Sequence, residues 1–270
     1  MDLSELNTSG LVLLGCGKMG SALLEGWLQN GLQAGAVSVL EPNPSDWLRE
    51  TGVHLNMALP ERPAMAVLAV KPQMMGDALP ALQALGGGGT VFVSIAAGTS
   101  LAMIEGVLGA GTPIVRAMPN TPAAVGRGIT ALIGNAFVPA AALDLSRALM
   151  AAVGQTVMLD TESQMDAVTG VSGSGPAYVF HLIETMAAAG VAQGLPEDMA
   201  LKLARATVAG AGALAEGVAE TPTQLRINVT SPNGTTAAAL EVLMDPQSGF
   251  PALVPRAIKA AADRSKELGE

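Results

Sequence analysis

The stretch that decides the fold is Leu11-Val-Leu-Leu-Gly-Cys-Gly-Lys-Met-Gly20, which leads into the apolar-periodic segment Ser21–Asn30. Its three glycines have the G-x-G-x-x-G spacing of a turn between a buried strand and a helix. The first glycine permits the tight turn, the second lets the backbone approach a pyrophosphate, and the third allows close packing of the helix on the strand. We therefore expect the helix N-terminus to face the phosphates of a dinucleotide. The predicted cofactor-binding residues in this turn are Gly15, Cys16, Gly17, Lys18, Met19 and Gly20.

Short aliphatic runs alternate with helical patterns over the first 160 residues, which is typical of a Rossmann-type, doubly wound parallel α/β sheet. After Leu159 the strand-like runs cease, and the remaining segments are typical of helices. Thr161-Glu-Ser-Gln164 has the sequence of a capping box, which marks the beginning of a helix. We therefore expect a dinucleotide-binding domain over residues 1–160 and an all-helical domain over residues 161–270. The predicted strands are Leu11–Leu14, Val37–Leu40, Ala64–Val70, Thr90–Ile95 and Pro113–Met118.

Glu41 closes the second predicted strand, about 20 residues after Gly20, where a carboxylate commonly accepts hydrogen bonds from the adenosine ribose hydroxyls. The same carboxylate would repel the 2′-phosphate of NADPH, and the first arginine able to hold that phosphate is Arg49. Glu41 is therefore a predicted cofactor-binding residue that favours NADH, or the use of both NADH and NADPH. A carboxylate that points into solvent is the alternative interpretation.

Two further segments follow predicted strands, and the carboxyl ends of strands line the ligand crevice of a doubly wound sheet. Arg116-Ala-Met-Pro-Asn-Thr-Pro122 follows the fifth strand, and its prolines hold Asn120 and Thr121 in a non-helical loop where they could face the nicotinamide. Turn formation alone explains these prolines equally well. The other segment is Ala69-Val-Lys-Pro72, which ends the third predicted strand and places Lys71 near the cofactor. A solvated lysine at the end of a strand is the alternative interpretation of Lys71. The predicted cofactor-binding residues of the two segments are Ala69, Val70, Lys71, Pro72 and Asn120.

The composition argues against several classes of protein. A formal net charge of −9, a sequence pI near 4.7 and the absence of a basic run argue against a nucleic-acid partner. The polar N-terminus is unlike a secretory signal, and no apolar run reaches the roughly 20 residues that cross a bilayer, so we expect a cytoplasmic protein without a membrane partner. One cysteine and two scattered histidines leave no recognisable metal site. For Cys16, a small tolerated loop residue is a simpler interpretation than a redox role.

A second glycine- and hydroxyl-rich turn opens an alanine-rich helix within Leu225–Leu240. Pro232, Asn233 and Gly234 interrupt the preceding helix, and the threonines that follow begin the next one. The free N–H groups of the first turn, the helix dipole and the hydroxyls would together bind a small anion such as a carboxylate. Ordinary helix capping is the alternative. The predicted substrate-binding residues are Ser231, Asn233, Gly234, Thr235 and Thr236.

These motifs together resemble the pyrroline-5-carboxylate reductase family over essentially the full length of the chain. The resemblance implies a Rossmann-type domain, an all-helical dimerisation domain, a homodimer that shares its active sites, and often a pentamer of such dimers. It also implies that the turn at Ser231–Thr236 binds the substrate carboxylate, although Asn233 stands where glycine is usual. Relatives often accept NADPH, so the resemblance leaves open which cofactor the chain prefers. The matching segments are Gly15–Gly20, Ala69–Pro72, Arg116–Pro122, Asp166–Tyr178 and Asn228–Thr236.

The substrate that the resemblance implies, 1-pyrroline-5-carboxylate, is a cyclic imine whose protonated form is already a strong electrophile. The enzyme would then mainly align this imine with the hydride of NADH or NADPH, giving L-proline. No carboxylate or histidine stands out as an acid, so we expect Thr236 to offer its hydroxyl to the ring nitrogen as the catalytic residue. Two other functions stay open at this point. They are a hydroxyacid dehydrogenase with Lys71 as proton shuttle, and a nucleotide sensor without turnover.

Overall fold

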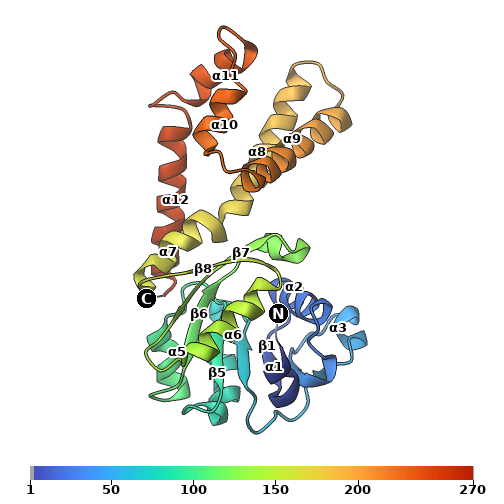
Figure 1. Ribbon diagram of the computed structural model, residues 1–270, viewed down its shortest axis with the longest axis vertical. Helices are drawn as coiled ribbons and strands as arrows, with labels where there is room; N and C mark the ends of the chain where they lie inside the picture. Colours follow the sequence, from blue (N-terminus) through green and yellow to red (C-terminus); the bar gives the residue numbers. More distant parts are fainter. Residues whose placement is uncertain (1–2, 270) are drawn as a thin grey trace. The chain divides into compact units, whose positions relative to one another are not determined.

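The computed structural model describes residues 3–269 (Figure 1). Its first part is built on one eight-stranded sheet with the strand order β3-β2-β1-β4-β5-β6-β7-β8. The order reverses between β1 and β4, which is the switch point where doubly wound folds bind their ligands. The strands are β1 Leu11–Leu14, β2 Val37–Leu40, β3 His54–Leu55, β4 Met65–Leu68, β5 Val91–Ser94, β6 Ile114–Met118, β7 Gly128–Gly134 and β8 Gly154–Met158.

The five predicted strands are present as β1, β2, β4, β5 and β6, and all neighbouring pairs among them are parallel. The predicted Rossmann-type parallel sheet is confirmed, with one exception at a strand that was not predicted: β7 pairs antiparallel with β6. Only residues 119–127 connect these two strands, which is too short for the helical crossover that a parallel pair requires. The sequence analysis did not predict β3, β7 or β8.

Apolar side chains cover both faces of the sheet, as the alternation within β1 illustrates. Leu11 and Leu13 lie in one buried cluster, and Val12 and Leu14 lie in the other. The first cluster includes side chains of helices α2 (Lys18–Gln29) and α6 (Ala140–Ala151), and the second includes side chains of α4 (Met75–Ala78) and α5 (Leu101–Leu108). In the first cluster, Trp27 is fully buried and its indole N–H donates to the backbone oxygen of Leu149 at 2.9 Å. Because the central strands are buried on both faces, they appear in the sequence as continuous aliphatic runs.

Helices of 4 to 12 residues surround the sheet, and the second part of the chain is helical, its longest helices having 18 to 21 residues (Figure 1). The helices of the first part are α1 Ser4–Ser9, α2 Lys18–Gln29, α3 Asp46–Glu50, α4 Met75–Ala78, α5 Leu101–Leu108, α6 Ala140–Ala151 and α7 Met165–Val168. Its 3-10 helices are η1 Ala34–Ala36, η2 Pro72–Met74, η3 Leu79–Leu85, η4 Thr121–Val125 and η5 Glu162–Gln164, and the π-helix η6 covers Thr169–Gly173. The later helices are α8 Gly175–Ala192, α9 Glu197–Gly217, α10 Pro222–Asn228, α11 Thr235–Leu243 and α12 Phe250–Glu267.

Contacts divide the described chain into two compact units, residues 3–173 with 261–269 and residues 174–260. The sheet ends at Met158, close to the expected boundary at residue 160, and the capping box at Thr161–Gln164 is present. The segments 161–173 and 261–269 nevertheless group with the sheet, so this division differs from the expected domains 1–160 and 161–270. We refer to the two parts as the sheet unit and the helical unit. None of the helices between residues 3 and 269 combines the length and apolarity that a membrane span needs.

Candidate active site

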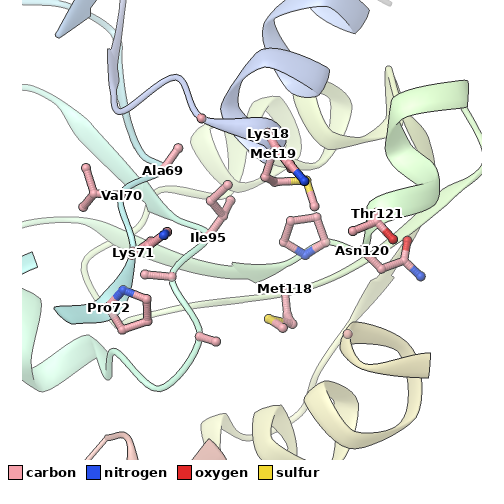
Figure 2. Close-up of a pocket in the computed structure, with 15 residues that line it drawn as sticks. Lys18, Met19, Ala69, Val70, Lys71, Pro72, Ile95, Met118, Asn120 and Thr121 are labelled. Carbon is pink, nitrogen blue, oxygen red and sulfur yellow. The ribbon is translucent and has the colours of Figure 1, made fainter. Parts of the chain in front are cut away.

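A pocket of about 580 Å³ opens at the carboxyl ends of β1, β4, β5 and β6, within the sheet unit (Figure 2). Figure 2 shows Lys18 and Met19 at the start of α2 and Asn120 and Thr121 on the segment that follows β6. The volume and the position at the switch point suit a dinucleotide. The lining residues are Gly17, Lys18, Met19, Ala69, Val70, Lys71, Pro72, Ile95, Ala96, Ala97, Met118, Pro119, Asn120, Thr121 and Gly173.

The pocket brings together residues that were predicted from three separate segments of the chain. These residues are Gly17, Lys18, Met19, Ala69, Val70, Lys71, Pro72 and Asn120. Three other predicted cofactor residues, Gly15, Cys16 and Gly20, are buried beneath the lining, and Glu41 is not among the lining residues either. Ile95–Ala97 and Gly173 also line the pocket but were not predicted from the sequence. The rule that strand ends line the crevice, applied to the end of β5, would have indicated the first of these two segments.

The three glycines of the turn have different surroundings. Gly15 has φ +88°, and a Cβ atom there would lie 2.9 Å from the backbone oxygen of Ala69. A Cβ atom on Gly20 would lie 2.6 Å from the backbone oxygen of Gly15, whereas one on Gly17 would have no neighbour within 4 Å. The fold therefore requires glycine at the first and third positions, while Gly17 leaves open space on the pocket side. That open backbone is what the approach of a pyrophosphate needs, so the residues fit the cofactor.

The carboxylate of Glu41 is bound to the turn itself. One carboxylate oxygen accepts a hydrogen bond from the backbone N–H of Cys16 at 2.8 Å, and the other accepts one from the N–H of Asn43 at 2.9 Å. Burial raises the pKa of the Cys16 thiol, against the opposing effect of its hydrogen bond with Ser21. A buried thiol with a raised pKa is a poor nucleophile, which agrees with the interpretation of Cys16 as a small loop residue.

Asn120 is buried and its carboxamide joins two neighbouring backbones. The side-chain oxygen accepts a hydrogen bond from the N–H of Ile129 at 3.0 Å, and the side-chain nitrogen donates to the backbone oxygen of Ser172 at 3.1 Å. Asn120 thus connects the loop after β6 to β7 and to the π-helix η6, and Gly173 at the end of η6 also lines the pocket. The side chain shapes the pocket wall in addition to any contact with a cofactor.

Arg116 and Glu162 form an ion pair of 2.9 Å, with side chains that are 7% and 31% exposed. The same carboxylate oxygen of Glu162 also accepts a hydrogen bond at 2.9 Å from the N–H of Leu101, the first residue of α5. Glu162 therefore ties the segment after the sheet to β6 and to the N-terminus of α5, where a negative charge is favourable.

We expect Glu162→Ala to lower the free energy of unfolding by about 2–3 kcal/mol, because it leaves the buried guanidinium of Arg116 without its partner. The partial exposure of Glu162 keeps the effect below that of a fully buried pair. Urea unfolding followed by circular dichroism measures it. Glu61→Ala, at an exposed position, is the matched control and should change stability by less than about 0.5 kcal/mol. Equal unfolding midpoints for the two variants would contradict the expected role of the pair.

The predicted substrate-binding turn lies in the helical unit, between α10 and α11. Asn233 has φ +59°, a left-handed conformation that asparagine tolerates better than most residues. A Cβ atom on Gly234 would collide with the side-chain oxygen of Ser231, so glycine preserves the position of that hydroxyl. Thr235 and Thr236 are the first two residues of α11, and no side chain caps the helix. The first-turn N–H groups are therefore open to a small anion.

Metal ligands are not grouped in the part of the chain that the structure describes, because no three of its His, Cys, Asp or Glu side chains converge on one point. The polar side chains that line the pocket are those of Lys18, Lys71, Asn120 and Thr121.

Comparison with known proteins identifies the family. A family model described as pyrroline-5-carboxylate reductase dimerisation matches residues 162–268, and one described as NADP oxidoreductase coenzyme F420-dependent matches residues 10–98. Among curated proteins, the pyrroline-5-carboxylate reductase of Pseudomonas aeruginosa is 39% identical, with 98% of each chain covered.

Solved structures agree with this result. The pyrroline-5-carboxylate reductase of Coxiella burnetii has a TM-score of 0.89 at 33% identity, covering 97% of this chain and 99% of that one. The pyrroline carboxylate reductase of Plasmodium falciparum, solved with NADP bound, has a TM-score of 0.85 at 29% identity, covering 98% and 99%. With similarity along its whole length in both sequence and fold, the chain belongs to the pyrroline-5-carboxylate reductase family.

Proposed function

We propose that the protein is a pyrroline-5-carboxylate reductase that transfers a hydride from NADH or NADPH to 1-pyrroline-5-carboxylate and gives L-proline, the last step of proline biosynthesis, in the cytoplasm. The full-length similarity to proteins of this name carries the proposal. The open backbone at Gly17 and the pocket around it support the cofactor half of the reaction. The cofactor would supply the hydride when bound, and the chain's own residues would bind and orient the protonated imine.

The substrate carboxylate is proposed to bind at the turn formed by Ser231, Asn233, Gly234, Thr235 and Thr236. The uncapped N-terminus of α11 offers N–H groups and the positive end of a helix dipole, both of which favour an anion. The hydroxyl of Ser231 keeps its place because Gly234 has no side chain. The turn thus supplies both charge complementarity and directional hydrogen bonds.

Thr236 is the proposed catalytic residue. Its hydroxyl lies one residue after the start of α11 and is only partly exposed. With the carboxylate held by the neighbouring N–H groups, this hydroxyl is proposed to hydrogen-bond the ring nitrogen. Reduction of the protonated imine adds the hydride to the carbon of the C=N bond and leaves the proton on the nitrogen. The two hydrogens added across that bond therefore come from the cofactor and from the protonated imine. No strongly acidic group is then required.

The direct test mixes the purified protein with pyrroline-5-carboxylate and either reduced cofactor. Absorbance follows the oxidation of NADH or NADPH, and the proline formed is quantified as the product. Stoichiometric proline formation is the expected result, and no oxidation with either cofactor would overturn the proposal.

Lys71→Met should retain turnover, because imine reduction needs no lysine proton shuttle. Loss of all turnover in that variant, with normal cofactor binding, would favour a hydroxyacid dehydrogenase instead.

Glu41 is proposed to set the cofactor preference towards NADH or dual use. Its carboxylate is hydrogen-bonded to the glycine-rich turn and would face the 2′-phosphate of NADPH with like charge. We expect Glu41→Gln to raise the ratio of kcat/KM for NADPH to kcat/KM for NADH about tenfold, since about 1.4 kcal/mol of repulsion is removed. Glu50→Gln, an exposed carboxylate on α3, removes the same charge and should leave the ratio unchanged. An unchanged ratio in Glu41→Gln would show that Glu41 does not select the cofactor.

The helical unit is proposed to form a homodimer, with a pentamer of dimers as the larger assembly. Within this unit α8, α10 and α11 contain no buried residue, and α9 buries only Ala200 and Ala204. Large apolar side chains such as Phe180 and Leu203 are 57% and 51% exposed. Helices with so little core of their own need a partner surface. Light scattering coupled to gel filtration measures the mass, and a monomer would contradict this proposal.

A further inference from the structure

The end of the chain packs against the loop that joins β5 to α5. Helix α12 ends at Glu267, and its last turns belong to the sheet unit (Figure 1). The hydroxyl of Ser265, which is 3% exposed, donates to a carboxylate oxygen of Asp166 on α7 at 2.7 Å. This buried hydrogen bond fixes the last turn of α12 to a segment that directly follows the sheet.

Leu268 and Gly269 then meet Gly98 in the middle of that loop. A Cβ atom on Gly98 would lie 2.9 Å from the Cβ atom of Leu268 and 3.1 Å from its carbonyl carbon. A Cβ atom on Gly269 would lie 2.5 Å from the backbone oxygen of Gly98. Contact this close requires glycine on both sides, and the positive φ of Gly98, +73°, requires it again.

The same loop forms one wall of the cofactor pocket. Ile95, Ala96 and Ala97, the three residues before Gly98, all line the pocket. Where it leaves β5, the loop is held to β4, because the N–H of Ile95 donates to the backbone oxygen of Leu68 at 3.0 Å. On the other side it is held at α5, where Glu162 accepts from the N–H of Leu101. Between these two anchors, Leu268 and Gly269 pack against Gly98.

We propose that Leu268 and Gly269 are positioning residues, which hold the β5–α5 loop in the conformation that binds the nicotinamide cofactor. The inference rests on the proposed use of this pocket by NADH or NADPH. Loss of the contact leaves Ile95–Ala97 free to shift, and a small shift of a pocket wall weakens binding of the molecule that touches it. The substrate-binding turn belongs to the other unit, so its intrinsic affinity for a carboxylate does not depend on this loop.

The test compares Gly98→Ala with Gly111→Ala. Both glycines have positive φ, +73° and +82°, so alanine strains the backbone similarly, but Gly111 has no neighbour within 4 Å of its Cβ position. We expect Gly98→Ala to raise the KM for the reduced cofactor about tenfold more than Gly111→Ala does. The KM for pyrroline-5-carboxylate and kcat at saturating cofactor should change less than about twofold in either variant. Equal cofactor KM values for the two variants would overturn the inference.

Truncation provides a second test that leaves the loop sequence intact. Removal of residues 268–270 should reproduce the cofactor defect of Gly98→Ala, whereas removal of Glu270 alone should not. Ser265→Ala, which loses only the hydrogen bond to Asp166, should give a smaller defect of the same kind. A truncated enzyme with wild-type KM for NADH and NADPH would overturn the inference.

One further variant separates this inference from the cofactor assignment on which it rests. Gly17→Ala places a methyl group at the open backbone of the pocket. If Gly17→Ala weakens cofactor binding and the truncation does not, only the positioning role of the terminus fails. If neither variant affects binding while the wild type turns over, the pocket is not the cofactor site.

Discussion

Replacing Thr236 by alanine should lower kcat about 100-fold while the dissociation constant for the reduced cofactor stays within about twofold of the wild-type value. The hydroxyl stands at the start of α11, in the turn proposed to bind the substrate carboxylate, and does not belong to the nucleotide pocket. A hydrogen bond that strengthens as the ring nitrogen gains electron density acts on turnover more than on binding. The factor lies at the low end for proton-transfer groups, because the imine enters the reaction already protonated.

Stopped-flow measurement of hydride transfer, with fluorescence titration of the cofactor, would separate the two quantities. Thr236→Ser keeps the hydroxyl and should recover kcat to within about fivefold of the wild type. Thr207→Ala, which removes an exposed threonine from α9, serves as the control for general effects on the helical unit. An equal loss of turnover and cofactor affinity in Thr236→Ala would remove this residue from the catalytic role.

The five predicted strands could be found from the sequence because burial on both faces makes most of their side chains apolar. Leu11–Leu14, for example, is entirely buried. β3 and β8 lack this signal. β8 is largely exposed at the sheet edge and contains Gln155 and Thr156, and β3 consists of only His54 and Leu55. The antiparallel placement of β7 depends on the length of its connection to β6, which the pattern within the strand does not record.

The residues of the candidate site also fall into those that could be predicted from the sequence and those that could not. Residues that carry a chemical signature, such as the glycines of the turn, Lys71 and Asn120, could be predicted from motif and position. Ile95–Ala97 has no chemical signature, because its side chains are apolar, and only its position at the carboxyl end of β5 could have indicated it. Contacts across the chain could not be predicted either. The hydrogen bond between Glu41 and Cys16 and the approach of Leu268 to Gly98 are properties of tertiary packing alone.

The two glycines Gly17 and Gly20 should respond differently to the same added methyl group. Gly17→Ala should raise the KM for the reduced cofactor at least about tenfold, because its Cβ atom would occupy the space that a pyrophosphate needs. The unfolding free energy should change by less than about 0.5 kcal/mol, since that Cβ atom meets no protein atom within 4 Å and φ is −69°. Gly20→Ala should instead lower the unfolding free energy by about 1–3 kcal/mol, because its Cβ atom would press on the backbone oxygen of Gly15.

Steady-state kinetics with each cofactor, together with urea unfolding of the same preparations, distinguishes a binding glycine from a packing glycine. A shift of Gly15 in the Gly20 variant would also move the neighbouring backbone of Ala69, so cofactor affinity should fall there as a consequence of lost structure. In Gly17→Ala the affinity should fall without any such loss. Wild-type KM values for both cofactors in Gly17→Ala would mean that no pyrophosphate lies against this turn, and the glycine spacing would then serve only the packing of α2 on β1.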